Sequence, residues 1–205
     1  MMDKNIQRKI LLAGTCWYEL TGLWHLLLAQ GYDVYCVPQG EPCASDGWNL
    51  IIVALSAEAV AGWGRHLSFI WELRVRMSGR MLVLVPERLK TLKVLLSFCD
   101  VYSGCEGLLN LIKEISRVLT EDAVHTDRFR LTEGQRRALK YLSERRRCGP
   151  LNLKRNGAEQ YYHNARLAEN VGVRDFRLLL LSGLDRELSS MEKLRLGRAE
   201  CKAML

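Results

Sequence analysis

The side chains best suited to binding nucleic acid gather in the last third of the sequence. Arginine, asparagine and glutamine pair with the edges of bases, and arginine and lysine neutralise phosphates. The residues that we expect to face the bases are Glu159, Gln160, His163, Asn164 and Arg166. The residues that we expect to hold phosphates are Arg145, Arg146, Arg147, Lys154 and Arg155. The alternative is that this stretch forms the ordinary polar surface of a packing domain.

The charge of the chain is unevenly distributed. Residues 1–120 contain 12 lysines and arginines against 11 acidic residues, whereas residues 121–205 contain 18 against 12. Nearly all of the formal charge of +7 therefore lies in the C-terminal part. Such an excess favours a polyanionic partner, because each neutralised phosphate releases condensed counterions. A basic face that only keeps the protein in solution is the simpler alternative.

The motifs of other chemistries are missing from the sequence. Gly14, Thr15 and Gly22 have neither the spacing of a dinucleotide-binding motif nor that of a P-loop, so we interpret them as a tight turn after a strand. The seven cysteines contain no C-x-x-C pair, and none has a histidine partner in a recognisable catalytic motif. We therefore expect no enzyme activity, no catalytic residues, no metal site, no cofactor and no small-molecule substrate.

The sequence also argues against a membrane protein. Its longest apolar stretches are interrupted by His25 and Glu58, so none reaches the ~18 to 20 residues that a spanning helix needs. Scattered cysteines without a pairing pattern are typical of reduced thiols. We expect a cytoplasmic protein with no membrane partner.

Residues 1–120 alternate between two hydrophobic periodicities. Short β-branched runs indicate buried strands, and apolar residues three or four apart indicate helices. Alternation of this kind predicts an α/β domain with a doubly wound parallel sheet. The expected strands are 9–14, 33–37, 49–55, 81–85 and 100–103, and the expected helices are 17–28, 60–75, 88–98 and 108–119.

The remainder of the chain predicts a smaller, all-helical domain. Residues 121–130 are polar and form the expected linker, and residues 131–205 form the expected second domain. Thr132 is the expected cap of its first helix, which Gly149-Pro150 ends, and Asp175 is the expected cap of a last helix that reaches Leu181. The helix between them covers residues 158–170, and its expected apolar side carries Tyr161, Tyr162, Ala165 and Ala168.

Three sequence features leave alternatives open. Tyr161 and Tyr162 could stack on unpaired bases, although aromatic residues at helical spacing more often belong to a core. Four of the five tryptophans lie within the first 63 residues, where each is either a core residue or part of an exposed partner surface. The segment 191–205 is either a dimerisation helix or a frayed end.

The C-terminal domain resembles the LuxR/NarL-type helix-turn-helix of bacterial transcription regulators. Its opening, residues 131–139 (LTEGQRRAL), is similar to the start of that motif, and residues 163–173 (HNARLAENVGV) are similar to its end. The stretch between them is about two residues shorter than in the family, and it contains Pro150. The resemblance implies that the helix over 158–170 enters the major groove of double-stranded DNA.

The same family often has a CheY-like receiver in front of this motif, and residues 8–119 have a similar order of elements. The positions that hold Mg²⁺ and the phosphoryl group in receivers are here Gly14-Thr15, Ala54, Val85-Pro86 and Tyr102. Gly14-Thr15 and Ala54 lack the carboxylates that hold Mg²⁺ and accept the phosphoryl group, Val85-Pro86 lacks the Thr/Ser hydroxyl, and there is no lysine near Tyr102. The resemblance therefore implies a degenerate, non-phosphorylatable receiver domain.

These patterns predict an atypical response regulator. We expect it to bind double-stranded DNA without phosphorylation, as a homodimer or as a heterodimer with a related regulator. The competing hypothesis is a protein-protein adaptor that modulates another transcription regulator and does not bind DNA itself. The shortened middle of the motif and Pro150 favour that hypothesis.

Overall fold

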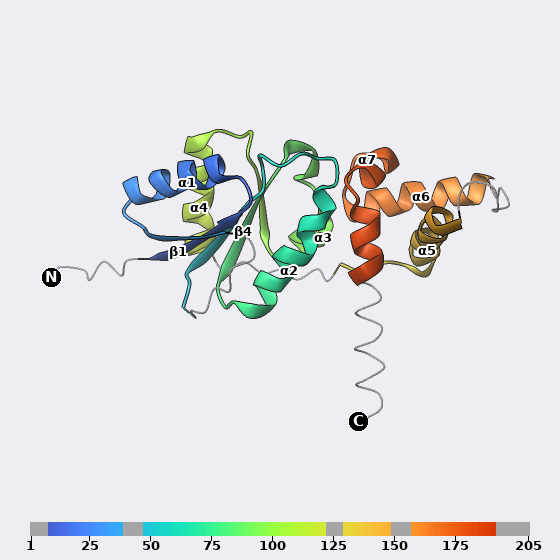
Figure 1. The fold of residues 1–205 in the computed structure, drawn as a ribbon, viewed down its shortest axis with the longest axis horizontal. Helices are drawn as coiled ribbons and strands as arrows, with labels where there is room; N and C mark the ends of the chain where they lie inside the picture. The colour runs from blue at the N-terminus through green and yellow to red at the C-terminus, as the bar shows by residue number, and fades with distance from the viewer. Residues whose placement is uncertain (1–7, 39–46, 122–128, 149–156, 192–205) are drawn as a thin grey trace, which may run out of the picture. The chain divides into compact units, whose positions relative to one another are not determined.

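The computed structural model describes residues 8–38, 47–121, 129–148 and 157–191, without the side chains of 145–148 and 157–160 (Figure 1). The chain forms two compact units. The first contains residues 1–59 and 70–128, and the second contains residues 60–69 and 129–205. The predicted linker falls mostly on 122–128, outside the described residues, so the boundary within 121–130 stays a prediction.

The first unit is built on a parallel sheet of five strands. Their order is β2-β1-β3-β4-β5, and every neighbouring pair is parallel. This is the order of flavodoxin-like doubly wound sheets and is compatible with a receiver-like domain. The α/β prediction and the five predicted strands are confirmed. The strands are β1 (Lys9–Gly14), β2 (Asp33–Pro38), β3 (Leu50–Ala54), β4 (Arg80–Val85) and β5 (Asp100–Ser103).

The strands are apolar throughout because both faces of the sheet are covered. All five residues of β3 are buried, as expected for a central parallel strand. One face packs against α1 (Trp17–Ala29) and α4 (Leu108–Thr120), which contribute Leu20, Leu27 and Ile115 to the core. The opposite face is covered by the helices that connect β3 to β4 and β4 to β5 (Figure 1).

Two of the predicted helices are shorter than their apolar pattern suggests. Residues 88–98 form a 3₁₀ turn, η2 (Glu87–Leu89), and one turn of helix, α3 (Lys93–Leu96), so the prediction of one helix there is wrong. Leu89, Leu92 and Leu95 are three residues apart, and the amides of Leu92 and Leu95 bond the carbonyls three residues earlier. That spacing suits successive tight turns rather than an α-helix. The region 60–75 contains η1 (Trp63–Arg65) and α2 (His66–Arg76).

The second unit contains α5 (Glu133–Cys148), α6 (Gly157–Val171), α7 (Phe176–Leu181) and a helical segment over 184–191. The predicted caps are confirmed. The amide of Gln135 donates to the Thr132 hydroxyl, and the Gln135 side chain accepts from the Thr132 amide at 2.9 Å, which is a capping box. Asp175 accepts from the amide of Leu178 at 2.8 Å. Gly172, with a φ of 87°, ends α6.

Residues 60–69 belong to the second unit although they come from the middle of the α/β sequence. The Gly62 amide donates to the Leu181 carbonyl at 2.9 Å, and the Gly64 amide donates to the Ser182 carbonyl at 2.7 Å. Between the two glycines, Trp63 is fully buried. Sequence patterns had placed this whole stretch in the first domain.

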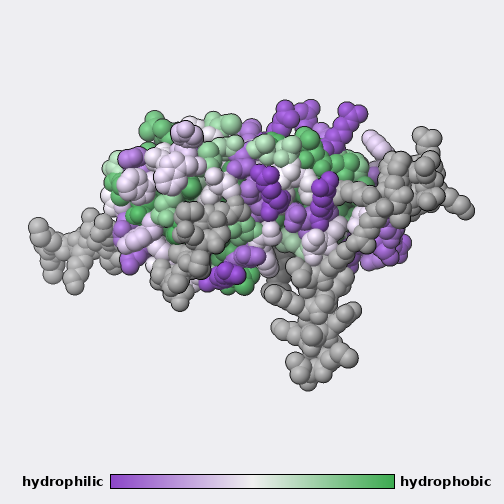
Figure 2. Space-filling view, viewed as in Figure 1, coloured by the Kyte–Doolittle hydropathy of each residue, from purple (hydrophilic) through white to green (hydrophobic). Residues whose placement is uncertain are grey.

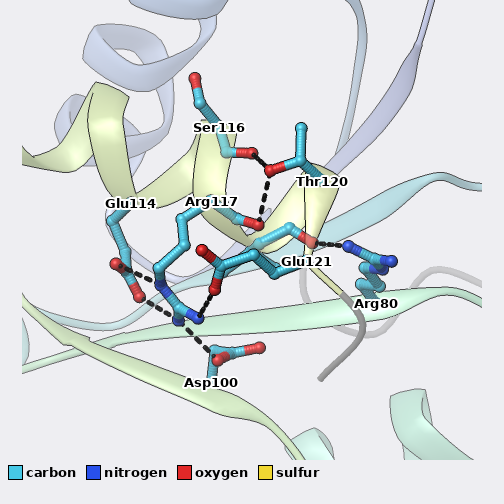
Figure 3. Close-up of polar contacts among 8 residues, drawn as sticks. Arg80, Asp100, Glu114, Ser116, Arg117, Thr120 and Glu121 are labelled. Atoms are coloured by element: carbon cyan, nitrogen blue, oxygen red, sulfur yellow. Dashed lines mark hydrogen bonds and ion pairs between the residues drawn. The ribbon is translucent and has the colours of Figure 1, made fainter. Parts of the chain in front are cut away.

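Arg117 on α4 organises a polar cluster in the first unit (Figure 3). Its guanidinium donates to Asp100 at 2.9 Å, to both carboxylate oxygens of Glu114, and to Glu121 at 3.1 Å. Hydrogen bonds with Glu114 and then with Asp100 raise the pKa of Arg117, so it stays charged at any physiological pH. The cluster joins α4 to the start of β5.

We expect Arg117→Met to lower the free energy of unfolding of the first unit by about 1–2 kcal/mol, because three carboxylates lose a shared donor. The effect stays in this range because 39% of the Arg117 side chain is exposed and solvent screens its charges. Lys113→Met, an exposed change on the same helix, is the matched control and should have almost no effect. Urea unfolding of both variants measures the difference, and equal midpoints would contradict this role of Arg117.

Within the described residues, no helix combines the length and apolar character needed to cross a membrane.

Candidate functional site

Helix α6 exposes a different side from the one that the sequence suggests. Leu167, Ala168 and Val171 are buried, whereas Tyr161 and Tyr162 are 76% and 56% exposed. The prediction of an apolar side with both tyrosines, Ala165 and Ala168 is therefore wrong, except for Ala168. The buried side is set by packing against α5 and α7.

Three of the residues predicted to face the bases have described side chains, and none of the three is fully buried. Arg166 is exposed, whereas His163 and Asn164 are half-buried. The ring of His163 lies against α5, where a Cβ on Gly134 would come within 2.9 Å of it. His163 therefore lies at the junction of α5 and α6.

Arg166 is held along the surface of its own helix. It forms an ion pair with Glu169 at 2.7 Å, donates to the Tyr162 hydroxyl at 3.3 Å, and lies 5.5 Å from the centre of the Tyr162 ring. Contacts with Tyr162 and then with Glu169 raise the pKa of Arg166. The guanidinium is charged and exposed, but a ligand anion must compete with Glu169 for it.

A buried amide fixes α6 relative to α5. Gln135 is 7% exposed, and its side chain donates to the Arg166 carbonyl at 3.1 Å. Its oxygen accepts from the Asn170 side chain at 3.0 Å as well as from the Thr132 amide. Asn170 also donates to the Arg130 carbonyl at 3.2 Å. The exposed side of α6 is therefore presented by a specific, well-bonded scaffold.

The other predicted contacts lie outside the described side chains. Arg145, Arg146 and Arg147 belong to α5, and Glu159 and Gln160 belong to α6, but only their backbone is described. Lys154 and Arg155 fall within 149–156, outside the described residues. Their role in binding stays a prediction.

Sequence reasoning missed two exposed cations that follow α6. Arg174 and Arg177 flank the cap residue Asp175 and are both exposed. Neither forms an ion pair with any residue in the described part of the chain. The signal that could have revealed them is their position beside a helix cap, where an arginine points to solvent more easily than within a packed helix.

The carboxyl edge of the sheet is a second place where polar groups converge. In doubly wound sheets, ligands bind at this edge. The amides of Ser56 and Ala57, after β3, donate to the carboxylate of Glu19 at 3.1 and 3.2 Å, and the Ser56 hydroxyl also donates to it. Successive amides in a turn are a typical anion-binding arrangement. Here the chain's own carboxylate occupies it.

The neighbouring groups at this edge are likewise bonded to one another. The hydroxyl of Thr15 donates to Glu58, and that of Ser103 donates to Glu87, which also pairs with Lys90. The bonds from Lys90 and then Ser103 lower the pKa of Glu87, and the contact with Glu87 raises the pKa of Lys90. Sequence reasoning emphasised the missing receiver carboxylates and overlooked these glutamates.

Two of the positions compared with receivers lie side by side at the carboxyl edge of the sheet. Gly14 and Ala54 end adjacent strands and are paired in register. A Cβ at Gly14 would come within 2.4 Å of the Ala54 carbonyl, so a larger residue does not fit there without a shift of the backbone. The described residues contain no group of three or more metal-ligating side chains. Burial raises the pKa of the Cys99 thiol well above its ordinary value, which disfavours the nucleophilic thiolate.

No family model, curated protein or solved structure with which the chain was compared matches it.

Proposed function

We propose that the chain is a bacterial transcription regulator that binds double-stranded DNA without phosphorylation, as a homodimer or with a related regulator. Helix α6 is the recognition helix of a helix-turn-helix, and α5 supports it. With paired α6 helices, the expected target has two half-sites about one helical turn apart. The first unit is a degenerate receiver that contributes partner contacts.

The observation that carries the proposal is the exposure of three arginines in the α6–α7 segment. Arg166, Arg174 and Arg177 are all open to solvent, in the part of the chain that holds nearly all of its excess positive charge. Arginine forms bidentate hydrogen bonds with phosphates and with guanine edges. Such an excess of positive charge favours a polyanionic partner.

The way in which α6 is held supports the same function. The buried amide of Gln135 and the half-buried amide of Asn170 bond α5 to α6, while Tyr161, Tyr162 and Arg166 remain exposed. A recognition helix needs this combination, because its register on DNA depends on a rigid support. The amides after β3 already bind the carboxylate of Glu19, so they do not need a phosphoryl group as a partner. This favours a regulator that acts without phosphorylation of its first unit.

A charge-reversal experiment tests the proposal. We expect Arg174→Glu with Arg177→Glu to weaken binding of the full chain to a short labelled duplex more than tenfold. The slope of log affinity against log salt should fall by about two, since each phosphate contact contributes ~0.9. Fluorescence anisotropy at several salt concentrations measures both quantities.

The matched control places the same charge change on the first unit. Arg76 and Lys113 are exposed on α2 and α4, and replacing both by glutamate should leave the salt slope nearly unchanged. A wild-type chain whose affinity does not depend on salt would contradict the proposal. Equal losses in the two double variants would also contradict it, because they would show an effect of net charge alone.

The adaptor hypothesis remains the second candidate, because Tyr161 and Tyr162 are exposed on α6. Exposed aromatic residues are enriched at protein interfaces. An adaptor would bind another regulator but would not bind DNA. In that case, the wild type would leave the anisotropy of labelled DNA unchanged, and Tyr161→Ala with Tyr162→Ala would abolish the complex with the regulator.

A further inference from the structure

Helix α1 has an outer surface without a charged side chain. Its one charged residue, Glu19, is bonded to the loop after β3, and Leu20, Leu23 and Leu27 are buried against the sheet. The remaining helices of this unit expose charged residues such as Lys113 on α4 and Arg76 on α2. In Figure 2, the atoms over α1 at the left of the view are mainly pale or green. An exposed helix of thirteen residues with this composition points to a partner surface.

We propose that this surface is the contact through which two copies of the chain associate, with the two α1 helices antiparallel across a twofold axis. The inference rests on the homodimer that the proposed function includes, and it identifies where that homodimer forms. It does not require DNA to be present.

The spacing of the exposed residues suits self-association. The exposed Trp17, Trp24 and Leu28 form one stripe along the helix with the half-buried Thr21, at intervals of four, three and four residues. In an antiparallel pair centred between residues 22 and 23, Trp17 of one copy faces Leu28 of the other, and Thr21 faces Trp24. Each tryptophan then meets a smaller residue. A twofold interface requires this self-complementarity.

The exposed area of α1 approaches that of a small specific dimer interface. The exposed fractions are 66% for Trp17, 38% for Trp24 and 42% for Leu28 in the stripe, and 88% for Tyr18, which lies beside it. Since an aromatic side chain has about 150–250 Å² of surface, these four expose roughly 450 Å² in one copy and 900 Å² in two. The uncharged neighbours of the stripe bring this close to the ~1,000 Å² that a biological interface needs.

The distribution of charge favours a second copy of the chain as the partner that binds the outer surface of α1. Two identical chains with a formal charge of +7 repel each other, and they can meet most easily through a surface that carries no charge. Residues 1–120, which contain α1, have only one more basic than acidic residue. A dimer formed through α1 therefore brings together the nearly neutral parts of the two chains.

Sedimentation velocity of the full chain at micromolar concentrations, without DNA, tests the inference. We expect the wild type to sediment as a particle of twice the 23.5 kDa chain mass. Trp17→Glu with Leu28→Glu places like charges opposite each other and should give a monomer with unchanged circular dichroism. Trp17→Lys with Leu28→Glu places opposite charges in contact across the axis and should restore the dimer.

The matched control is Val75→Glu with Leu96→Glu, which adds the same charge at exposed apolar residues on α2 and α3. It should leave the dimer intact. A monomeric wild type, or a dimer that survives the like-charge variant, would overturn the inference, and a different protein would then be the occupant. If the variants associate as expected but neither the wild type nor any variant binds DNA, the inference about the dimer holds and the proposed function is wrong.

Discussion

Replacing Gly64 by alanine is expected to lower the melting temperature of the second unit by about 12–24 °C, which corresponds to roughly 3 kcal/mol. The added Cβ would lie 2.8 Å from the carbonyl carbon of Gly183 and 2.8 Å from the amide nitrogen of Leu184. Both are backbone atoms, so no side chain can rotate away to make room. The Gly64–Ser182 hydrogen bond and its neighbour from Gly62 to Leu181 would have to lengthen.

Gly22 provides the matched control for this substitution. It lies in the middle of α1 and is exposed, and a Cβ built on it would have no atom within 4 Å. Gly22→Ala should therefore stabilise the first unit by about 0.5–1 kcal/mol, because alanine favours a helix interior. Differential scanning calorimetry measures both variants. If Gly64→Ala melted at the wild-type temperature, the close approach of residues 60–69 to the last helices would be wrong.

Gln135→Leu is expected to lower the free energy of unfolding of the second unit by about 3 kcal/mol. The leucine fills a similar volume but cannot bond the Thr132 amide, the Asn170 side chain or the Arg166 carbonyl. Groups that lose a partner in a buried place each cost about 1–3 kcal/mol. The capping box of α5 and the link between α5 and α6 would be lost together.

Thr132→Ala separates these two contributions. It removes only the capping hydroxyl and should cost about 1 kcal/mol. Chemical unfolding followed by circular dichroism compares the two variants with the wild type. A stabilising Gln135→Leu substitution would show that the junction gains more from apolar packing than from its hydrogen bonds. In that case, the rigid presentation of α6 would need another cause.

The sheet and the caps could be predicted from the sequence because each is set by local patterns. The continuous apolar run of β3 is buried on both faces whatever covers it, and every predicted strand forms. The caps at Thr132 and Asp175 depend on a side chain and an amide only three residues apart. Interactions of such short range can be predicted directly from the order of the residues in the sequence.

The candidate site could be predicted only in part. Arg166 was placed correctly on an exposed side of its helix, but its ion pair with Glu169 and the exposure of Tyr161 were not foreseen. Arg174 and Arg177 were overlooked although they lie beside the predicted cap Asp175, because the sequence does not show which arginines lack an acidic partner. When two sides of a helix each contain both apolar and polar residues, either side can be buried. Which side is buried depends on the elements that pack against the helix.

The sequence by itself determined the parallel α/β sheet, the helical C-terminal part, the helix caps and the uneven distribution of charge. Only the tertiary structure decided that residues 60–69 join the second unit, that Glu19 binds the amides after β3, and that α1 presents an uncharged outer side. The physical reason is distance along the chain. Local propensity and periodicity act over a few residues, whereas burial and partner choice depend on groups brought together from positions far apart in the sequence.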